Sequence, residues 1–318
     1  MNDPVPSLGG PPLARTGIDR AALRRTDRQW LAAAWERARV LVIQPDGRLL
    51  CTPEPALVFV DPDPSVPADD RLFLGIDPDG TPYFAVVGEL PERPGARPVT
   101  LREVGAKLSD RDAGLFTTAA ALANWHAAHR YSPVTGEETV VADGGWLRLD
   151  PTGRQLFPRT DPAIIVLVHD GVSGMNGRCL LGNNASWPTR PGGRRFFSTL
   201  AGFVEPGESA EAAVAREVYE EVGVTVSDLR YRGSQAWPFP GSLMLGYTAY
   251  ADPEQPLRPD PSEIADARWF TRTEIGKLFS DQPDPWRADA PATPEGTVTL
   301  PGPASIAHYL IQLWLTEA

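Results

Sequence analysis

The chain has 318 residues, enough for two domains, and 42% of them are hydrophobic, as in an ordinary globular protein. Its 30 lysines and arginines against 41 aspartates and glutamates give a formal net charge of −11. This charge argues against a general nucleic-acid binder, because contacts to phosphates dominate such binding. The two cysteines, Cys51 and Cys179, exclude a disulfide framework, and no apolar run approaches the roughly 20 residues of a membrane span. We therefore expect a cytoplasmic protein.

The first predicted domain, residues 1–130, mixes helices and strands. A helix is expected within 19–39, and residues 99–130 are expected to be mainly helical. Between them, turn sequences separate short runs that are typical of strands, at 38–43, 56–60, 72–76 and 83–87. This pattern predicts a small α+β N-terminal domain.

Residues 131–157 are polar and rich in turn residues, and they predict a linker. His126 and His129, one helical turn apart, precede it. They do not predict a metal site, because no other ligand lies nearby in the sequence.

The rest of the chain, residues 158–318, alternates strands with few helices. A helix is expected at about 209–221 and another at about 304–316. Strands are expected at 163–169, 178–182, 196–201, 229–237 and 242–251. The pattern predicts an α/β/α sandwich around a mixed sheet.

The most informative stretch is residues 202–224, GFVEPGESAEAAVAREVYEEVGV. Glu217, Glu220 and Glu221 lie at i, i+3 and i+4, so a helix places the three carboxylates on one face. Clustered carboxylates repel one another unless a cation such as Mg²⁺ or Mn²⁺ binds them, and such an ion can hold a diphosphate at the same time. We expect the flanking glycines to form the turn before this helix and its C-terminal cap.

This stretch resembles the Nudix box at every specified position. The resemblance implies a hydrolase that acts on a nucleoside diphosphate linked to another group. It implies that Glu217, Glu220 and Glu221 bind the metal, and that Arg216 orients these carboxylates. Glu221 is the first choice for the catalytic base and Glu220 the second, and the sequence does not separate base from ligand.

A second motif, Ser234-Gln235-Ala236-Trp237-Pro238-Phe239-Pro240-Gly241-Ser242, follows the box. Aromatic rings stiffened by prolines can form a wall against a base or a nicotinamide ring, although such a segment can also be a simple hydrophobic plug. Placed after a Nudix box, it resembles the signature of the NADH pyrophosphatases, with Ala236 where that family has proline.

That resemblance implies further site residues. Glu263 would complete the metal set from outside the box, while Phe157 and Phe203 would sandwich an aromatic ring of the substrate. The pocket would also be lined by Ala201, Gln235, Ala236, Trp237, Pro238, Phe239, Pro240, Gly241, Ser242 and Ala307. The alternative is that the two phenylalanines are core residues and Glu263 a surface charge. The same resemblance implies a homodimer.

The family has a four-cysteine zinc ribbon between its domains, but the corresponding positions here are Ser132, Thr135, Asp150 and Gly153. A structural zinc needs thiolate or imidazole ligands in a tetrahedral arrangement. We therefore expect a degenerate ribbon-like linker without zinc.

The expected function is metal-dependent hydrolysis of NADH, and less firmly of NAD⁺, to nicotinamide mononucleotide and AMP. One alternative is removal of an NAD cap from the 5′ end of RNA. Another, from a different class, is a non-catalytic nucleotide sensor. The intact box carboxylates argue against that sensor, because a sensor could lose them freely.

Overall fold

The computed structural model describes residues 10–187, 195–281 and 297–317, whose internal contacts form two compact units. Among these residues, unit 1 comprises 13–160 together with the short segment 236–242, and unit 2 comprises the remainder. The predicted linker, 131–157, groups with unit 1. The division into 1–130, 131–157 and 158–318 stays a prediction.

Unit 1 is built on a three-stranded sheet of order β1-β4-β3. β1 runs parallel to β4, and β3 runs antiparallel to β4. Helix α1 buries Ala34 and Trp35 against Val40, Phe73 and Phe84 of the sheet. The elements of this part are β1 (Arg39–Ile43), β3 (Leu72–Ile76), β4 (Pro82–Val87), α1 (Arg28–Trp35), α2 (Leu101–Val104) and α3 (Asp110–Ala128).

One strand expected in unit 1 is wrong. Residues 56–60 make only isolated bridges, at Leu57 and Val60. The Leu57 N–H donates to the buried carboxylate of Asp112, 3.0 Å away, rather than to a strand ladder. A separate antiparallel pair, β2 (Leu49–Cys51) with β5 (Arg97–Val99), was not predicted from the sequence.

The ribbon-like segment forms a three-stranded sheet of order β6-β7-β8 (Val140–Ala142, Leu147–Leu149 and Gln155–Leu156). Buried Ser132 donates to Asp150 Oδ2 over 3.0 Å. Asp150 Oδ1 accepts from the Thr152 N–H, the Thr152 hydroxyl and the Arg154 N–H, at 2.9, 2.6 and 3.0 Å. Two positions that would be zinc ligands in a ribbon are thus joined directly by a hydrogen bond.

His126 ties helix α3 to this ribbon. Arg148 donates to its Nδ1 over 2.9 Å, so Nε2 carries the hydrogen and donates to the Gly145 carbonyl over 2.8 Å. Burial lowers the pKa of His126 to about 4, so the ring is neutral at pH 7. Both ring nitrogens therefore have protein partners.

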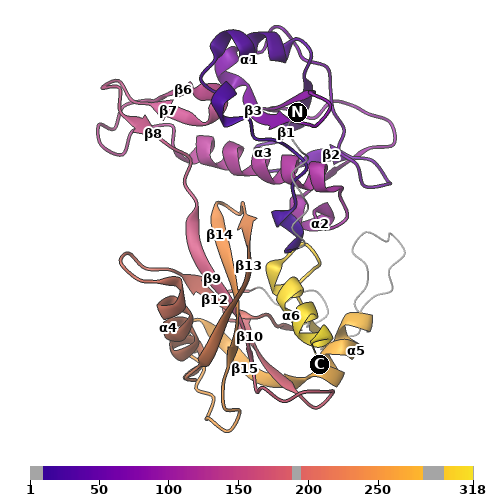
Figure 1. Ribbon diagram of the computed structural model, residues 1–318, viewed down its shortest axis with the longest axis vertical. Coiled ribbons are helices and arrows are strands. Elements are labelled where there is room, and N and C mark those ends of the chain that lie inside the picture. Colours follow the sequence, from indigo (N-terminus) through magenta and orange to yellow (C-terminus); the bar gives the residue numbers. More distant parts are fainter. Residues whose placement is uncertain (1–9, 188–194, 282–296, 318) are drawn as a thin grey trace. The chain divides into compact units, whose positions relative to one another are not determined.

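Unit 2 is a sheet between helices, with strand order β13-β14-β9-β10-β15 and β12 paired to β9. The alternation along β9 defines its two faces: Ile164, Val166 and Val168 pack in one core with helix α4, and Ile165 and Leu167 pack in another with helix α6. Figure 1 shows α4 and α6 on opposite sides of this sheet. The predicted sandwich is confirmed.

The second half of unit 2 differs in detail from the expected pattern. The strand expected at 196–201 is split into β11 (Arg195–Phe196) and β12 (Leu200–Phe203). The remaining elements are β9 (Asp161–His169), β10 (Arg178–Asn184), α4 (Ala210–Val222), β13 (Ser227–Trp237), β14 (Ser242–Tyr250), β15 (Ile264–Thr271), α5 (Arg272–Asp281), β16 (Val298–Thr299) and α6 (Ile306–Thr316). No helix among the described residues is both long and apolar enough to cross a membrane.

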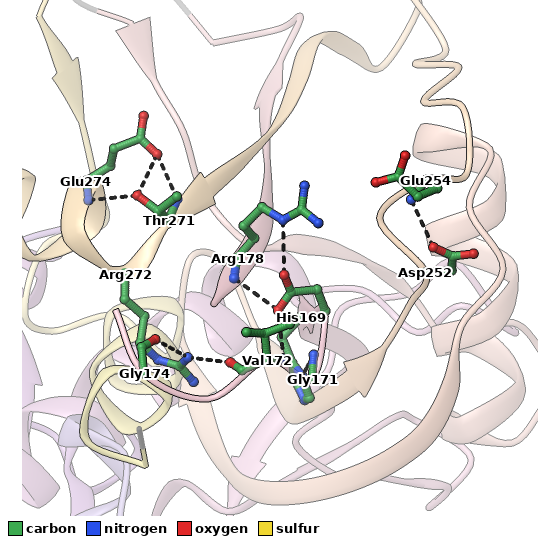
Figure 2. A network of polar contacts seen from close by, with 11 residues as sticks. His169, Gly171, Val172, Gly174, Arg178, Asp252, Glu254, Thr271, Arg272 and Glu274 are labelled. Carbon is green, nitrogen blue, oxygen red and sulfur yellow. Dashed lines mark hydrogen bonds and ion pairs between the residues drawn. The ribbon is translucent and has the colours of Figure 1, made fainter. Parts of the chain in front are cut away.

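A polar network holds the β9–β10 connection to the C-terminal helix (Figure 2). Buried Arg272 donates to the carbonyls of Val172 and Gly174, at 2.8 and 3.0 Å, and to that of Trp314 at 3.2 Å. Arg178 pairs with the buried carboxylate of Asp170 over 3.0 Å. These contacts join the turn to the start of α5 and to α6, so this network is structural.

Candidate active site

Helix α4 carries the clustered carboxylates, and its boundaries agree with the predicted helix. Its N-cap is Ser209, whose hydroxyl accepts from the Ala212 N–H over 3.1 Å. At the other end Gly223 has φ 72°, a left-handed cap that suits glycine. Val214, Val218 and Val222 bury one face of α4 in the core. Glu221 is buried beside this face, Glu217 is half-buried and Glu220 is exposed.

Arg216 is the central cation of the box. It donates to both oxygens of Glu208 at 2.8 Å, and to Glu217 and Glu220 at 2.9 Å each. It also donates to the Phe203 carbonyl over 2.9 Å. Hydrogen bonds from Arg216 lower the pKa of Glu208 to about 2. Arg216 thus contacts Glu217 and Glu220 of the predicted set, and its orienting role stays a prediction.

Glu221 is the most perturbed carboxylate of the site. Its side chain is only 4% exposed, and its Oε2 has no hydrogen-bond partner among the described residues. Burial, and after it the charges of Glu217 and Glu263, raise its pKa to about 8, against a hydrogen bond from the Ala201 backbone. A carboxyl group held this way lacks a compensating cation.

Glu217 owes its position to a glycine. A Cβ atom on Gly202 would lie 1.9 Å from the Glu217 carboxyl carbon, so only glycine leaves room for this carboxylate. Gly202 belongs to strand β12. The expectation that it forms the turn before the helix is therefore wrong, because its role is to let the carboxylate approach the strand.

Glu263 reaches the cluster from the loop before β15. The Asp260 N–H donates to the Glu221 carbonyl over 3.0 Å, and the Glu263 N–H donates to the Asp260 carbonyl over 3.0 Å. This loop therefore lies along the C-terminal turn of α4. Because the charge of Glu263 raises the pKa of both Glu217 and Glu221, the structure brings this distant residue to the box.

The four carboxylates fit a hard dication in chemistry, but two of them are paired with arginine. In the part of the chain that is described, no group of three or more His, Cys, Asp or Glu side chains is close enough to hold a metal ion as placed. Glu217 and Glu220 are each paired with Arg216 over 2.9 Å. The unpartnered oxygen of Glu221 and the mutual repulsion of Glu217, Glu221 and Glu263 are what Mg²⁺ or Mn²⁺ would relieve.

The predicted ring-binding residues differ in their surroundings. Phe157 is 61% exposed and Phe203 is 60% exposed, so neither is a core residue among the described parts of the chain. Ala307 is buried in α6. Gln235 is buried and donates to the Ala304 carbonyl over 3.0 Å, so its amide links β13 to the residues before α6.

The signature segment 236–242 lies between β13 and β14 but has its contacts in unit 1. Asn124 of α3 donates to the carbonyls of Pro238 and Pro240, at 2.8 and 3.2 Å. Arg102 of α2 lies over the Trp237 and Phe239 rings, 5.0 and 4.2 Å from their centroids. Sequence analysis missed Arg102 and Asn124, because neither belongs to a motif.

Comparison with known proteins agrees with this geometry. Residues 159–291 match the NUDIX domain, and residues 30–125 match the NADH pyrophosphatase-like rudimentary NUDIX domain. The NAD-capped RNA hydrolase NudC of Mycobacterium tuberculosis is 41% identical over 311 residues, covering 96% of this chain and 94% of that protein. The human NAD-capped RNA hydrolase NUDT12 is 34% identical over 220 residues, covering 66% of this chain and 43% of that protein.

The chain belongs to the Nudix hydrolases, within their NADH pyrophosphatase family. The predicted family and the predicted hydrolase class are confirmed. Among solved structures, the NUDIX domain of Shewanella oneidensis NrtR, complexed with ADP ribose, is 17% identical. It covers 40% of this chain and 81% of that one with a TM-score of 0.33, too partial a likeness to carry an argument.

Proposed function

We propose that this protein hydrolyses the diphosphate of NAD-linked nucleotides in a metal-dependent reaction. For NADH, water would attack one phosphorus and the bridging P–O bond would break, giving reduced nicotinamide mononucleotide and AMP. The observation that carries the proposal is the buried carboxylate of Glu221, one oxygen of which has no partner among the described residues, beside Glu217 and Glu263. A perturbed carboxylate with charged neighbours is typical of a catalytic site.

The metal requirement is part of the proposal. Glu217, Glu220, Glu221 and Glu263 would hold Mg²⁺ or Mn²⁺, which when bound neutralises the diphosphate and acidifies a bound water. Glu221 would accept the proton of the attacking water, with Glu220 as the second choice. Arg216 would keep Glu208 and the Phe203 carbonyl in place when Glu217 and Glu220 turn to the ion, because it holds all four.

The NAD cap of RNA is a second candidate substrate. The relatives named NAD-capped RNA hydrolases support it, one of them at 41% identity over nearly the whole chain. Recognition limited to the cap would need few contacts to RNA phosphates, which suits a chain of net charge −11. On the family resemblance we also propose a homodimer in the cytoplasm, and light scattering on the purified protein would test the dimer.

The deciding experiment compares NADH, NAD⁺ and NAD-capped RNA under identical conditions, with Mg²⁺, with Mn²⁺ and with a chelator. We expect cleavage that needs the metal and yields mononucleotides from NADH or a 5′-monophosphate RNA from the capped RNA. Turnover undiminished by the chelator would contradict the metal requirement. No cleavage of any of the three would contradict the function.

A further inference from the structure

The signature segment 236–242 is held in place by two residues of unit 1 that no motif singles out. Asn124 uses one side-chain nitrogen for two carbonyls, Pro238 and Pro240, which flank Phe239. Both carbonyls belong to prolines, whose rings lack an N–H donor, so the segment has few hydrogen bonds of its own. Within it, the Phe239 N–H donates to the Trp237 carbonyl over 2.7 Å.

The aromatic side chains of the segment have a second support. Trp237 and Phe239 pack edge to face, with centroids 4.9 Å apart. The Arg102 guanidinium lies over both rings, at 5.0 and 4.2 Å. A cation over an aromatic face attracts the ring and restricts its rotation. Asn124 thus holds the backbone of the segment, and Arg102 holds its two rings.

We propose that Arg102 and Asn124 are positioning residues for the dinucleotide: they hold the Trp237–Pro240 segment in the conformation that receives a substrate ring. The inference rests on the proposed function, since it takes the segment to be part of the substrate site. A preformed wall lowers the ordering cost of binding, so its loss should raise KM more than it lowers kcat.

The test uses two substitutions in the full-length chain. Asn124→Asp keeps the size of the side chain but replaces both donors with a carboxylate that repels the two carbonyls. Arg102→Met keeps an unbranched side chain and removes the charge. We expect each to raise KM for NADH about fivefold to tenfold, with kcat within about twofold of wild type and unchanged Mg²⁺ dependence, as for the loss of one or two modest contacts.

Matched controls distinguish positioning from general loosening. Arg102→Lys keeps a cation over the rings and should restore most of the wild-type KM. Arg24→Met removes a comparable cation from over the Trp30 ring, 5.3 Å away elsewhere in unit 1, and should leave KM unchanged. Melting temperatures of all variants show whether each one is folded at the assay temperature.

Hydrogen exchange of the peptide covering 233–243 provides a readout that needs no activity. We expect amide exchange there to accelerate about tenfold in Asn124→Asp while the peptides of α4 stay unchanged. Unchanged exchange would overturn the anchoring, and faster exchange with an unchanged KM would overturn the positioning role. A wild-type protein that does not cleave NADH would instead contradict the proposed function.

Discussion

Two buried carboxylates in this chain have opposite environments. Glu221 and Asp150 are each 4% exposed. The pKa of Glu221 is raised to about 8, chiefly by burial, and one of its oxygens has no partner among the described residues. The pKa of Asp150 is lowered, first by the Thr152 hydroxyl and also by hydrogen bonds from Ser132 and Arg154.

The difference separates a carboxylate that we propose binds a cation from one whose charge is met by hydrogen-bond donors. The carboxylates of the box helix repel one another, and a bound metal ion would offset this repulsion. In the ribbon, by contrast, hydroxyl and amide donors surround the carboxylate of Asp150. A buried acid with enough donors is structural, whereas a buried acid without them indicates a functional site.

The sharpest test of this contrast is Glu221→Gln. We expect kcat for NADH to fall at least about 100-fold, as for the loss of a general base or metal ligand. The fold should persist, because the neutral amide lacks the like-charge repulsion of the carboxylate. Glu211→Gln, on the same helix but in its first turn, is the control and should keep near wild-type turnover. Near wild-type kcat for Glu221→Gln at saturating Mg²⁺ would refute the assignment.

Phe203→Ala tests the substrate side of the box. Loss of ring stacking is worth about 1–3 kcal/mol, so kcat/KM should fall about 5- to 150-fold with unchanged Mg²⁺ dependence. Because Phe203 is 60% exposed, the melting temperature of the Phe203→Ala variant should stay close to that of wild type. A large fall in melting temperature with unchanged kinetics would make Phe203 a packing residue.

The raised pKa of Glu221 predicts how stability depends on pH in the metal-free protein. A group with a folded pKa near 8 and an ordinary value of 4.5 stabilises the fold when protonated, and this stability is lost as the pH rises between those values. The full shift would be worth at most about 5 kcal/mol, at 1.36 kcal/mol per pKa unit. We therefore expect the melting temperature to fall by several degrees from pH 5 to pH 8.

Calorimetry with a chelator and then with Mn²⁺ measures this slope. Glu221→Gln should flatten it, and Mn²⁺ should raise the melting temperature more at pH 8 than at pH 5. A wild-type melting temperature that does not decrease across this range would show that Glu221 does not carry the charge penalty.

The smallest effect is expected in the ribbon. Asp150→Ala leaves the Thr152 and Arg154 N–H groups without their acceptor, which should destabilise by about 1–3 kcal/mol. At a temperature where the variant is folded, kcat should be unchanged. The comparison variant Asp150→Asn keeps an acceptor oxygen and should be destabilised less.

Calorimetry with a chelator, together with elemental analysis, tests the predicted absence of zinc. A chelator should leave the melting temperature at pH 5 unchanged, and elemental analysis should find no stoichiometric zinc. One zinc per chain retained through dialysis would show that other ligands have taken over, and would break the contrast between the ribbon and the box.

Much of the candidate site could be predicted from the sequence because its residues are close together in the chain. Glu217, Glu220 and Glu221 share a helix face by spacing alone, and Ser209 and Gly223 bound that helix as cap residues do. Serine, threonine, aspartate and glycine in place of four cysteines likewise make a zinc ribbon chemically untenable without any structure.

Other features depended on contacts between distant residues. Asn124 lies 114 positions from Pro238, and nothing in the helix that contains Asn124 indicates the loop that it holds. Gly202 was expected in a turn, because a strand glycine that admits a carboxylate looks the same in sequence as a turn glycine. The lack of a hydrogen-bond partner for one oxygen of Glu221, among the described residues, likewise depends on the residues that surround it in the fold.

Local spacing therefore determined that the charged residues of the box helix share one face, because helix geometry repeats every few residues. The tertiary structure decided which of these charges is buried, which are paired with Arg216, and which segment rests on Arg102 and Asn124. Burial and pairing depend on neighbours from other elements, and a pKa depends on burial and pairing.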